Sequence, residues 1–328
     1  MVMILTLHAN EPLGPFATAQ SASRPLMSFI RLCIANINIV SVNVFIIISG
    51  WFGIKARTKG ILSIFFQLSF FSVLLLLAYS IFYPVSFSII KDTAISCLGL
   101  NYWFIPSYII LYVLSPSLNS FMEQADKKTF GWVLGAFLVF AFLYGRFGDK
   151  GHFIDGHSAI WFIGLYLTSG YLRRYPGRLF SLPILGDFGL FLSITGITTL
   201  IGFYLGGASL DSPHSIFHYN HPLVLAASVF FFLPFTKMKI QSEAINWLAS
   251  SAFAIYVIHK HFMVYDSYQN LFVNLHETLP IGTFMAVSAL IILLVAISCI
   301  LLDKFRILAW NGCQRLLHSV SCPFSFPN

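Results

Sequence analysis

The sequence predicts an all-α fold: a polytopic membrane helix bundle of about ten transmembrane helices, the first of which is truncated at its N-terminal side. Of the 328 residues, 57% are hydrophobic and only 9% are charged, whereas soluble domains carry about a quarter charged residues. Apolar runs also recur along the chain at a length of about 20 residues, which is the length that crosses a bilayer as a helix. The third observation is that Lys and Arg gather in alternate loops.

The apolar runs define the expected spans in chain order. Met1–His8 is too short to cross a bilayer, and we expect it to be the second half of a helix whose beginning is missing. Pro84 stops the third span, residues 85–99 are expected to form a loop, and Pro106 and Pro116 are expected to kink the fourth span. Spans two to ten are expected at about Ile34–Ile54, Ile61–Tyr83, Leu100–Leu118, Phe130–Phe147, His157–Leu172, Ile184–Leu205, Pro222–Phe235, Ile245–Tyr265 and Ile281–Leu302.

The basic residues predict the orientation of these spans. Thirteen of the 19 Lys and Arg residues lie in one set of alternate loops, and cytoplasmic loops are the ones that collect them. Both termini are then cytoplasmic, as an even number of spans requires. We therefore expect one membrane domain, residues 1–310, and a basic, frayed cytoplasmic tail, residues 311–328. The cytoplasmic set is Lys55, Arg57, Lys59, Lys127, Lys128, Arg173, Arg174, Arg178, Lys237, Lys239, Lys304, Arg306 and Arg315.

The stretch Val42–Trp51 stands out within the second span. It carries one amide, Asn43, inside an apolar run, and an intramembrane Asn marks either a packing contact or a site. It then reaches the small pair Ser49 and Gly50, which permits close approach between helix backbones. A basic cluster, Lys55–Lys59, closes it on the predicted cytoplasmic side.

Four histidines are predicted to share one level near the outer boundary. His8 ends the first helix, His157 opens span six and His221 precedes span eight. His259 lies about 20 residues, or roughly 30 Å, from the inner end of span nine. Histidine passes protons near neutral pH, but a histidine at a helix end is also often an interfacial residue with a half-wet ring. Both interpretations stay open.

Several other classes of function are disfavoured. The net charge of +7 is better explained by basic cytoplasmic loops than by nucleic-acid binding, because no basic stripe with interleaved aromatic residues occurs. The five cysteines have no CxxC spacing, and no Cys, His and Asp set has metal-ligand spacing, so no metal is expected. No cleavable signal peptide is evident, because Met1–Leu7 has no basic segment before it.

Five stretches, in the right order, resemble the integral-membrane acyltransferase-3 family of bacterial O-acyltransferases, which modify surface polysaccharides such as capsule, O-antigen and exopolysaccharide. VNVFIIISGWF resembles the family signature VxxFFxxSGYF, and MILTLHAN resembles the end of its first helix. The other three matching stretches are NYWFIPSYIILYVLSPSL, SAIWFIGLYLTSGYLRRY and NWLASSAFAIYVIHKHFMV. Together they span Met1 to Val264, nearly the whole chain.

The resemblance implies a multi-pass enzyme of the bacterial inner membrane, surrounded by membrane lipid. It would move an acetyl or other short acyl group from cytoplasmic acetyl-CoA to a hydroxyl of a glycan or of a lipid-linked saccharide. His8 matches the family's catalytic histidine, and His259, expected at the same depth on another helix, is the second catalytic candidate. The chemistry needs a base and donors for the developing oxyanion, for which the candidates are Asn43, Ser49 and Tyr256. The CoA phosphates need cations, for which the candidates are Lys55, Arg57 and Lys59, with Arg173 and Arg174 second.

Two positions depart from the family pattern. The family carries an Arg ten residues before the catalytic histidine, a place that falls before Met1, so the chain represents either an internal start or a truncated product. The family's paired-arginine RxxR is replaced loosely by Lys55–Lys59. Two other functions remain open. One is a transporter or flippase of a lipid-linked saccharide, although residues 1–164 and 165–328 show no convincing repeat; the other is a non-catalytic homologue.

Overall fold

The computed structural model describes residues 1–13, 18–19, 22–147, 155–206 and 215–320. This part of the chain forms fourteen α-helices and two short 3₁₀ helices and contains no β-strand, so the predicted all-α class is confirmed. The 3₁₀ helices are η1 (Glu11–Leu13) and η2 (Arg178–Ser181). The α-helices are α1 (Val2–Asn10), α2 (Pro25–Asn38), α3 (Val40–Phe52), α4 (Thr58–Phe82), α5 (Phe87–Cys97), α6 (Phe104–Gln124), α7 (Lys127–Phe147), α8 (Ala159–Arg174), α9 (Ile184–Leu205), α10 (Pro222–Lys237), α11 (Glu243–Ala249), α12 (Ala252–His259), α13 (Phe262–Thr278) and α14 (Ile281–Val320).

Six helical stretches of the described residues are long and apolar enough to cross a membrane, so the predicted count of ten is not confirmed. The predicted second span is present: α2 and α3 form one 28-residue stretch, Pro25–Phe52, which is interrupted at Ile39. The remaining five long stretches are Thr58–Phe82, Phe104–Gln124, Lys127–Gly145, Ile184–Leu205 and Ile281–Gly312, and a shorter apolar helix covers Pro222–Lys237.

The expected span at Ile245–Tyr265 is wrong as a continuous helix. The chain breaks between α11 and α12 at Ser250 and Ser251, and again after His259, where α13 begins. The Ser250 hydroxyl donates to the Trp247 carbonyl at 2.8 Å, and such local hydroxyl bonds compete with the helical ladder. His259 therefore does not sit at the end of a straight 30 Å rod, and its depth is set by how the short helix α12 packs.

Two segments expected to be irregular are helical. The segment after Pro84 contains α5, which begins at an N-cap where the Ser86 hydroxyl accepts a bond from the Ile89 N–H at 3.4 Å. Residues 311–320 of the tail that was expected to fray continue α14 to Val320, and residues 321–328 lie outside the described part of the chain. Both errors arise because short or amphipathic helices carry a weaker hydropathy signal than membrane spans.

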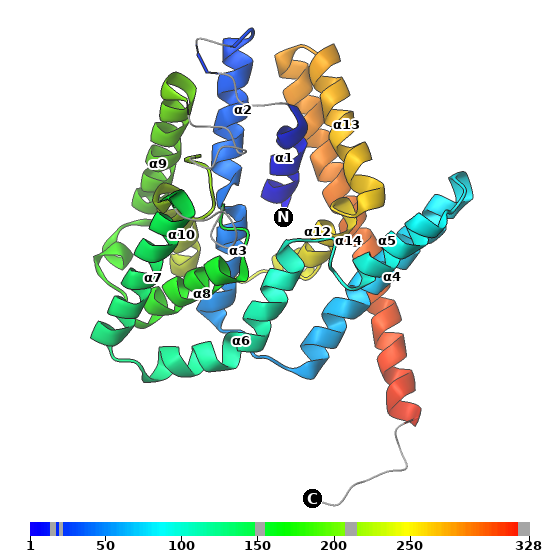
Figure 1. Ribbon diagram of the computed structural model, residues 1–328, viewed down its shortest axis with the longest axis horizontal. Helices are drawn as coiled ribbons and strands as arrows, with labels where there is room; N and C mark the ends of the chain where they lie inside the picture. The colour runs from blue at the N-terminus through cyan, green and yellow to red at the C-terminus, as the bar shows by residue number, and fades with distance from the viewer. Residues whose placement is uncertain (14–17, 20–21, 148–154, 207–214, 321–328) are drawn as a thin grey trace, which may run out of the picture.

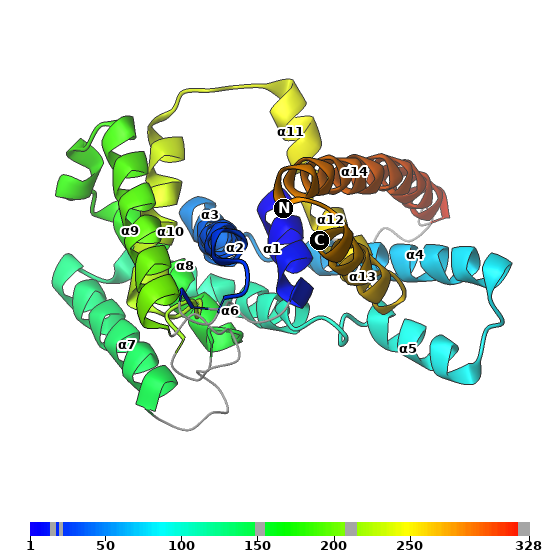
Figure 2. The same ribbon diagram turned by 90° about the horizontal axis from the view of Figure 1, so that it is seen from above.

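The helices form two groups with α1 between them. Seen from above, α2, α3, α7, α8, α9 and α10 lie on one side of α1, and α4, α5, α12, α13 and α14 lie on the other (Figure 2). Helix α1 packs against α2 on one side and against α13 and α14 on the other. Helix α1 therefore lies between the two groups, with its N-terminus near the middle of the bundle (Figure 1).

The predicted close approach at Ser49–Gly50 occurs between α3 and α8. A Cβ atom built on Gly50 would lie 2.6 Å from the Tyr166 carbonyl oxygen and 3.0 Å from the Ser169 Cβ atom. No side chain fits in that space, so the absence of one at residue 50 lets the two backbones touch. The Ser169 hydroxyl completes the contact by donating to the Ile47 carbonyl at 2.6 Å.

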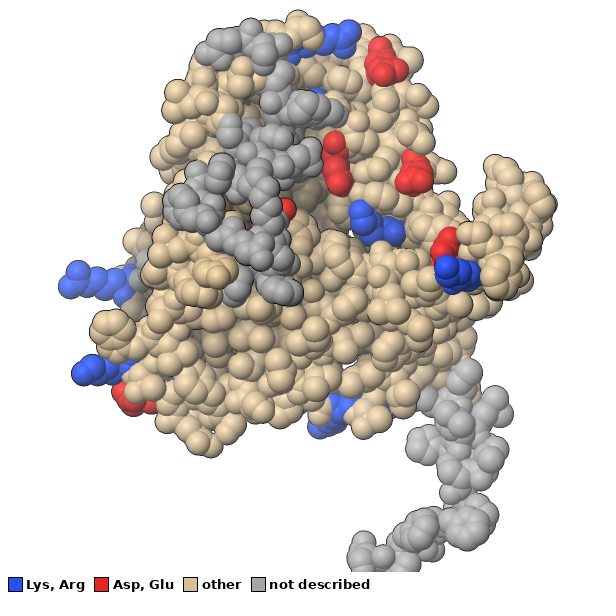
Figure 3. Space-filling model, in the orientation of Figure 1, with Lys and Arg blue, Asp and Glu red and all other residues tan. Residues whose placement is uncertain are grey.

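The outer surface of the bundle is apolar over large areas. Large hydrophobic side chains stand almost fully exposed on several helices, including Phe82 at 77%, Leu185 at 83% and Leu205 at 82%. Figure 3 shows charged side chains only sparsely on one face, with wide uncharged areas between them. Together with the six long apolar stretches, this surface is that of a multi-pass membrane protein.

Candidate active site

The site is built around two histidines that are 251 residues apart in the sequence. His8 lies in the last turn of α1, and His259 is the last residue of α12. The His8 Nδ1 and His259 Nε2 atoms are 2.8 Å apart, a hydrogen-bond distance, and the ring centroids are 5.1 Å apart. His259 is 1% exposed. The structure thus brings together two of the histidines that the sequence places at one level.

Tyrosine hydroxyls hold both helix ends in place. Tyr268 on α13 donates to the Leu5 carbonyl of α1 at 2.9 Å. Tyr102 donates to the Val257 carbonyl of α12 at 3.1 Å. Both tyrosines are buried, and each bond satisfies a backbone carbonyl in an apolar interior. The two bonds limit movement of α1 and α12 relative to α13 and the start of α6.

The hydrogen-bond chain assigns the neutral tautomer of each ring. His259 Nδ1 lies 2.5 Å from the Ile255 carbonyl oxygen, which only accepts, so this nitrogen carries the proton. In the neutral ring, His259 Nε2 then accepts, and the donor to it is His8 Nδ1. The remaining nitrogen, His8 Nε2, keeps its lone pair. The pair therefore presents one basic nitrogen, as an oriented histidine does in a catalytic triad.

A polar cavity of about 290 Å³ opens beside His8. One wall is aromatic: the Trp103 ring centroid lies 4.3 Å from that of His157 and 6.1 Å from that of Tyr219, the latter in a stacked arrangement. The described residues lining this cavity are Leu7, His8, Glu11, Ile39, Trp103, Asp155, His157, Phe217, His218, Tyr219 and Lys260. Flat aromatic faces beside carboxylates and imidazoles suit a polyhydroxylated ligand.

Charged groups surround the mouth of this polar cavity. Asp155 Oδ1 lies 3.0 Å from His218 Nε2. Glu11 accepts a hydrogen bond from the Tyr265 hydroxyl at 2.7 Å, and Lys260 Nζ lies 3.3 Å from the centre of the Tyr265 ring. These groups come from four separate parts of the chain. Together they place hydrogen-bond donors and acceptors around the basic nitrogen of His8.

A second, narrow cavity of about 20 Å³ touches His8 from another direction. It is mainly apolar, and Phe45, Phe253 and Tyr256 are among its lining residues. The Tyr256 ring is 5% exposed, and its centroid lies 6.1 Å from that of His259. His8, Leu7, Trp103 and Tyr219 line both cavities, so the imidazole stands where the two spaces adjoin.

The comparison with protein families decides the class of this protein. The model of a family described as acyltransferase domain matches residues 1–303. The chain belongs to the acyltransferase-3 family. A search of curated proteins and a search of solved structures each found no match to this chain.

Asn43 of the acyltransferase lies behind the aromatic wall. Its side-chain nitrogen donates to the Tyr219 carbonyl at 2.8 Å, and its oxygen accepts from Trp161 Nε1 at 3.0 Å. The residue is fully buried and is not among the described residues that line either cavity. Its observed contacts join α3, α8 and the segment that carries Tyr219. An oxyanion-binding role for Asn43 stays a prediction.

The other two oxyanion candidates occupy different places. Ser49 lies two helical turns after Val42 on α3, and its hydroxyl donates to the Phe45 carbonyl at 3.1 Å. It is not among the described residues that line the two cavities. Tyr256 lines the narrow cavity next to His8. Position therefore favours Tyr256 among the three candidates for contact with a group that reacts at His8.

The two predicted basic groups of the acyltransferase meet at one end of the bundle. Lys55, Arg57 and Lys59 are exposed on the turn between α3 and α4. Arg173 donates to the Trp51 carbonyl at the end of α3, and Arg174 donates to the Met122 carbonyl near the end of α6. We call this end of the molecule, defined by Lys55–Lys59 and Arg173, the basic end.

The turn at the basic end is held by buried hydroxyl and amide groups. The Tyr166 hydroxyl accepts from the Ile54 N–H at 2.8 Å, and Asn119 donates to the Ile54 carbonyl at 2.9 Å. The Tyr112 hydroxyl accepts from the Arg57 N–H at 2.8 Å. Gly53, with φ of 75°, makes the turn out of α3 in a conformation that other residues rarely adopt. A turn fixed in this way presents its three cations in a defined arrangement.

Sequence reasoning missed four polar groups of the polar cavity: Glu11, Asp155, His218 and Lys260. Two signals were available. Glu11 follows His8 by three residues, which places both on one helical face, and Lys260 adjoins His259 within IYVIHKH. For Asp155 and His218 no local signal exists, because their pairing depends on a backbone bond from the Tyr219 N–H to the Asp155 carbonyl, at 2.9 Å. His221, expected at the same level, instead caps α10 by accepting from the Leu223 N–H at 3.3 Å.

Among the described residues, no group of three or more His, Cys, Asp and Glu side chains is arranged to hold a metal ion.

Proposed function

We propose that this acyltransferase moves an acetyl group, or another short acyl group, from acyl-CoA to a hydroxyl of a cell-surface polysaccharide or of its lipid-linked precursor. The observation that carries the proposal is the basic nitrogen of His8, which the hydrogen bond to His259 orients and which stands where two cavities adjoin. A general base that acts on two substrates must be reached by both at once. A position between two cavities allows this, because neither substrate displaces the other.

The polar cavity suits the acceptor. A sugar ring has apolar faces of C–H bonds and a rim of hydroxyls, so it can stack on the Trp103 and Tyr219 rings while Asp155 and Glu11 accept hydrogen bonds from its hydroxyls. One hydroxyl then lies within reach of His8 Nε2. A cavity of about 290 Å³ takes one or two sugar units and leaves the rest of a longer glycan outside.

The narrow cavity suits the thioester end of the acyl donor. Its lining is apolar, as a short acyl chain requires, but its volume of about 20 Å³ holds only a water-sized group, so the lining side chains must move apart to admit the donor. Tyr256 would offer a hydroxyl proton to the carbonyl oxygen as that oxygen becomes negative. The nucleotide end of CoA carries phosphates that the basic end, with Lys55, Arg57 and Lys59, is suited to bind. In this arrangement the donor extends from the basic end toward His8.

The reaction balances without a metal or a redox step. The acceptor hydroxyl oxygen attacks the thioester carbonyl carbon while His8 Nε2 takes the hydroxyl proton. The resulting tetrahedral oxyanion collapses, the carbon–sulfur bond breaks, and the CoA thiolate leaves. His8 returns its proton to that thiolate, so the ester and free CoA–SH are formed and His8 regains its starting tautomer. His259 stabilises the transient imidazolium of His8 through its Nε2 lone pair.

We infer that the enzyme lies in the bacterial inner membrane with its basic end toward the cytoplasm, because the distribution of Lys and Arg favours that orientation. The basic end then faces the cytoplasmic pool of acyl-CoA. The polar cavity then opens toward the outer side, where the acceptor glycan is exposed.

The test is acyl transfer by the purified full chain in liposomes. Radiolabelled acetyl-CoA and a lipid-linked oligosaccharide are supplied, and alkali-labile label on the glycan is measured. We expect ester formation by the native chain and a loss of about a thousandfold or more in His8→Gln. Binding of acetyl-CoA to the variant serves as the control for folding. Full activity in His8→Gln would overturn the proposed role of His8, and movement of the saccharide across the bilayer without any acyl donor would favour a transporter instead.

A further inference from the structure

Two cavities lie between α2 and α14, on the side of α1 that faces away from the polar cavity. We call the groove that contains them the seam. On α2 its residues are Arg24, Met27, Arg31 and Ile34, which recur every three or four positions and so share one face. On α14 they include Ile281, Phe284, Ser288 and Ile292. One of the two cavities, of about 470 Å³, is at the end where α2 and α14 begin, and the other, of about 270 Å³, is deeper.

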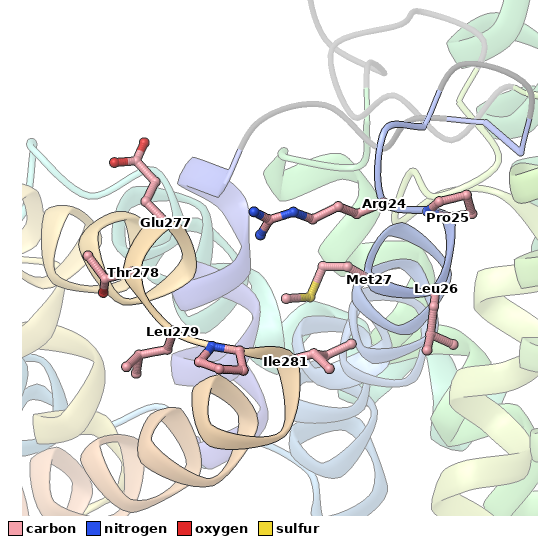
Figure 4. A pocket seen from close by; sticks show the side chains of 9 residues that line it. Arg24, Pro25, Leu26, Met27, Glu277, Thr278, Leu279 and Ile281 are labelled. Carbon is pink, nitrogen blue, oxygen red and sulfur yellow. The ribbon is translucent and has the colours of Figure 1, made fainter.

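The first of these two cavities, which we call the rim cavity, is charged and open. Arg24 extends from the start of α2 across the opening toward the α13–α14 turn, and Glu277 stands at the far edge (Figure 4). Both of these charged side chains are exposed. Leu26, next to Arg24, is 65% exposed. The opening therefore presents a guanidinium beside apolar side chains, which is the arrangement found at a membrane–water boundary.

The deeper cavity, which we call the seam cavity, is apolar apart from a polar collar. Its walls are mostly side chains of Leu, Ile, Phe, Met, Val and Ala. The collar consists of Asn10, Arg31 and Ser288. Arg31 and Ser288 each lie seven residues beyond the rim residue of their own helix, Arg24 and Ile281, or about 10 Å along the helix axis. The two collar residues therefore face the seam at a similar depth.

Two observations at the collar indicate a ligand with an anionic head. Arg31 is 6% exposed, and its guanidinium donates to the Asn10 side-chain oxygen at 3.1 Å and to the Asn10 carbonyl at 3.4 Å. Ser288 is 9% exposed, and its hydroxyl has no hydrogen-bond partner among the residues that the structure describes. A buried hydroxyl beside a buried cation matches the oxygen atoms of a phosphate.

The position of the seam relative to the active site identifies the occupant. Asn10, which contacts Arg31, is followed in the chain by Glu11, which lines the polar cavity beside His8. The η1 turn spans both sites, because Glu11 faces the polar cavity and Leu13 faces the seam cavity. Only the end of α1 and the η1 turn therefore lie between a phosphate bound at the collar and a sugar bound at His8.

We propose that the seam between α2 and α14 binds the lipid anchor of the acceptor saccharide, with its hydrocarbon chain in the seam cavity and its phosphate at Arg24 and Arg31. This proposal rests on the proposed function, since it names the acceptor as a saccharide carried on a long-chain lipid phosphate. The lipid holds the saccharide at the rim, the sugar passes over η1, and its terminal unit enters the polar cavity. Glu277 on the opposite edge directs the phosphate toward the arginines of α2 by charge repulsion.

The test fills the seam without touching either active-site cavity. Ala289→Trp places an indole in the seam cavity, while Ala286→Trp, one turn earlier on α14 at an exposed position that is not among the lining residues, is the matched control. Transfer is measured to a polyprenyl-diphosphate-linked oligosaccharide and to the same oligosaccharide released from its lipid. We expect Ala289→Trp to reduce transfer to the lipid-linked acceptor by about tenfold or more and to leave the released acceptor unaffected. We expect Ala286→Trp to change neither.

A binding measurement separates this proposal from the proposed function. Native mass spectrometry of the full chain with polyprenyl phosphate needs neither an acyl donor nor a sugar. We expect adducts with the native chain and with Ala286→Trp, fewer with Ala289→Trp, and fewer in Arg24→Gln. Polyprenyl phosphate binding without any transfer would uphold the seam and overturn the proposed function. Equal binding by both Trp variants, or displacement of the polyprenyl phosphate by equimolar phosphatidylglycerol, would overturn the seam proposal and show a site for bulk phospholipid.

Discussion

His8 and His259 form one hydrogen-bonded unit, with 2.8 Å between His8 Nδ1 and His259 Nε2, although each belongs to a different short helix. His259 donates its single ring proton, on Nδ1, to the Ile255 carbonyl of its own helix. The α12 backbone therefore fixes the orientation of His259, and His259 fixes the tautomer of His8. Neither helix spans a membrane alone, so tyrosine contacts from α13 and from the start of α6 position the pair.

The first prediction concerns this pair. His259→Leu removes the acceptor that selects the His8 tautomer, so we expect kcat to fall by about a hundredfold while the KM for acyl-CoA changes little. Steady-state kinetics on the purified chain measures both values. Because the two residues act as a unit, the double variant with His8→Gln is expected to be no worse than His8→Gln alone. Losses that multiply in the double variant would show that the rings act independently.

The second prediction concerns Asn43 as a positioning residue. Asn43→Leu leaves the Trp161 Nε1–H and the Tyr219 carbonyl without their partner, and we expect a loss of about 1–3 kcal/mol in stability. Trp161→Phe removes one of these stranded groups. The double variant is therefore expected to lose less stability than the sum of the single variants, as measured by thermal unfolding. Additive losses would mean that the indole–amide bond does not stabilise the fold.

The third prediction compares two helical glycines. Gly50→Ala forces a methyl group to within 2.6 Å of the Tyr166 carbonyl oxygen, so α3 and α8 must separate. Overpacking of this kind costs about 1–3 kcal/mol. Gly135→Ala on α7 is the matched control, because a methyl group there meets no described atom within 4 Å. Fluorescence-detected size exclusion after heating is expected to show a lower melting temperature for Gly50→Ala and no decrease for Gly135→Ala.

The fourth prediction concerns the basic end. Replacing Lys55, Arg57 and Lys59 together by Gln removes three exposed cations from the turn between α3 and α4. We expect the KM for acyl-CoA to rise by about tenfold at low salt and the difference to shrink as salt is added. The control is Lys127→Gln with Lys128→Gln, at the start of α7. If both replacements raised the KM for acyl-CoA equally, the effect would come from the overall positive charge of this end of the molecule and not from phosphate contacts at the turn.

The fifth prediction uses pH. Hydrogen bonds from the side chain and N–H of Thr129, and from the Lys128 N–H, lower the pKa of Asp126, which precedes α7. A lowered pKa in the folded chain stabilises the fold above the unfolded pKa of 3.8, and this contribution disappears as the pH falls through the folded value. Asp126→Ala is therefore expected to melt earlier than the native chain at pH 7. The difference in melting temperature between the two chains is expected to disappear at a pH below the lowered pKa. A difference that persists there would show that Asp126 stabilises the fold through packing and not through its charge.

Hydropathy alone determined much of the fold. The helix Ile184–Leu205 was predicted at both of its ends, because a long apolar run between polar loops has one stable state in a bilayer. The sequence also predicted that His8 and His259 share one level, and the two rings are hydrogen-bonded in the structure. Gly50 was correctly expected at a close helix contact. Each of these features is local: a run length, a residue type or a small side chain.

Only the tertiary structure decided which polar groups share a cavity. The break at Ser250–Ser251 turns the expected straight span into short pieces, and this places His259 against His8. Asn43 was a candidate for chemistry by its residue type, and only the structure shows that its side chain bonds Trp161 of α8 and the Tyr219 carbonyl. Asp155 and His218 are brought together by a backbone hydrogen bond from the Tyr219 N–H to the Asp155 carbonyl, which joins residues 64 positions apart in the sequence. The physical reason is that hydrophobicity acts on each segment separately, whereas hydrogen bonds between distant segments exist only after the helices have packed.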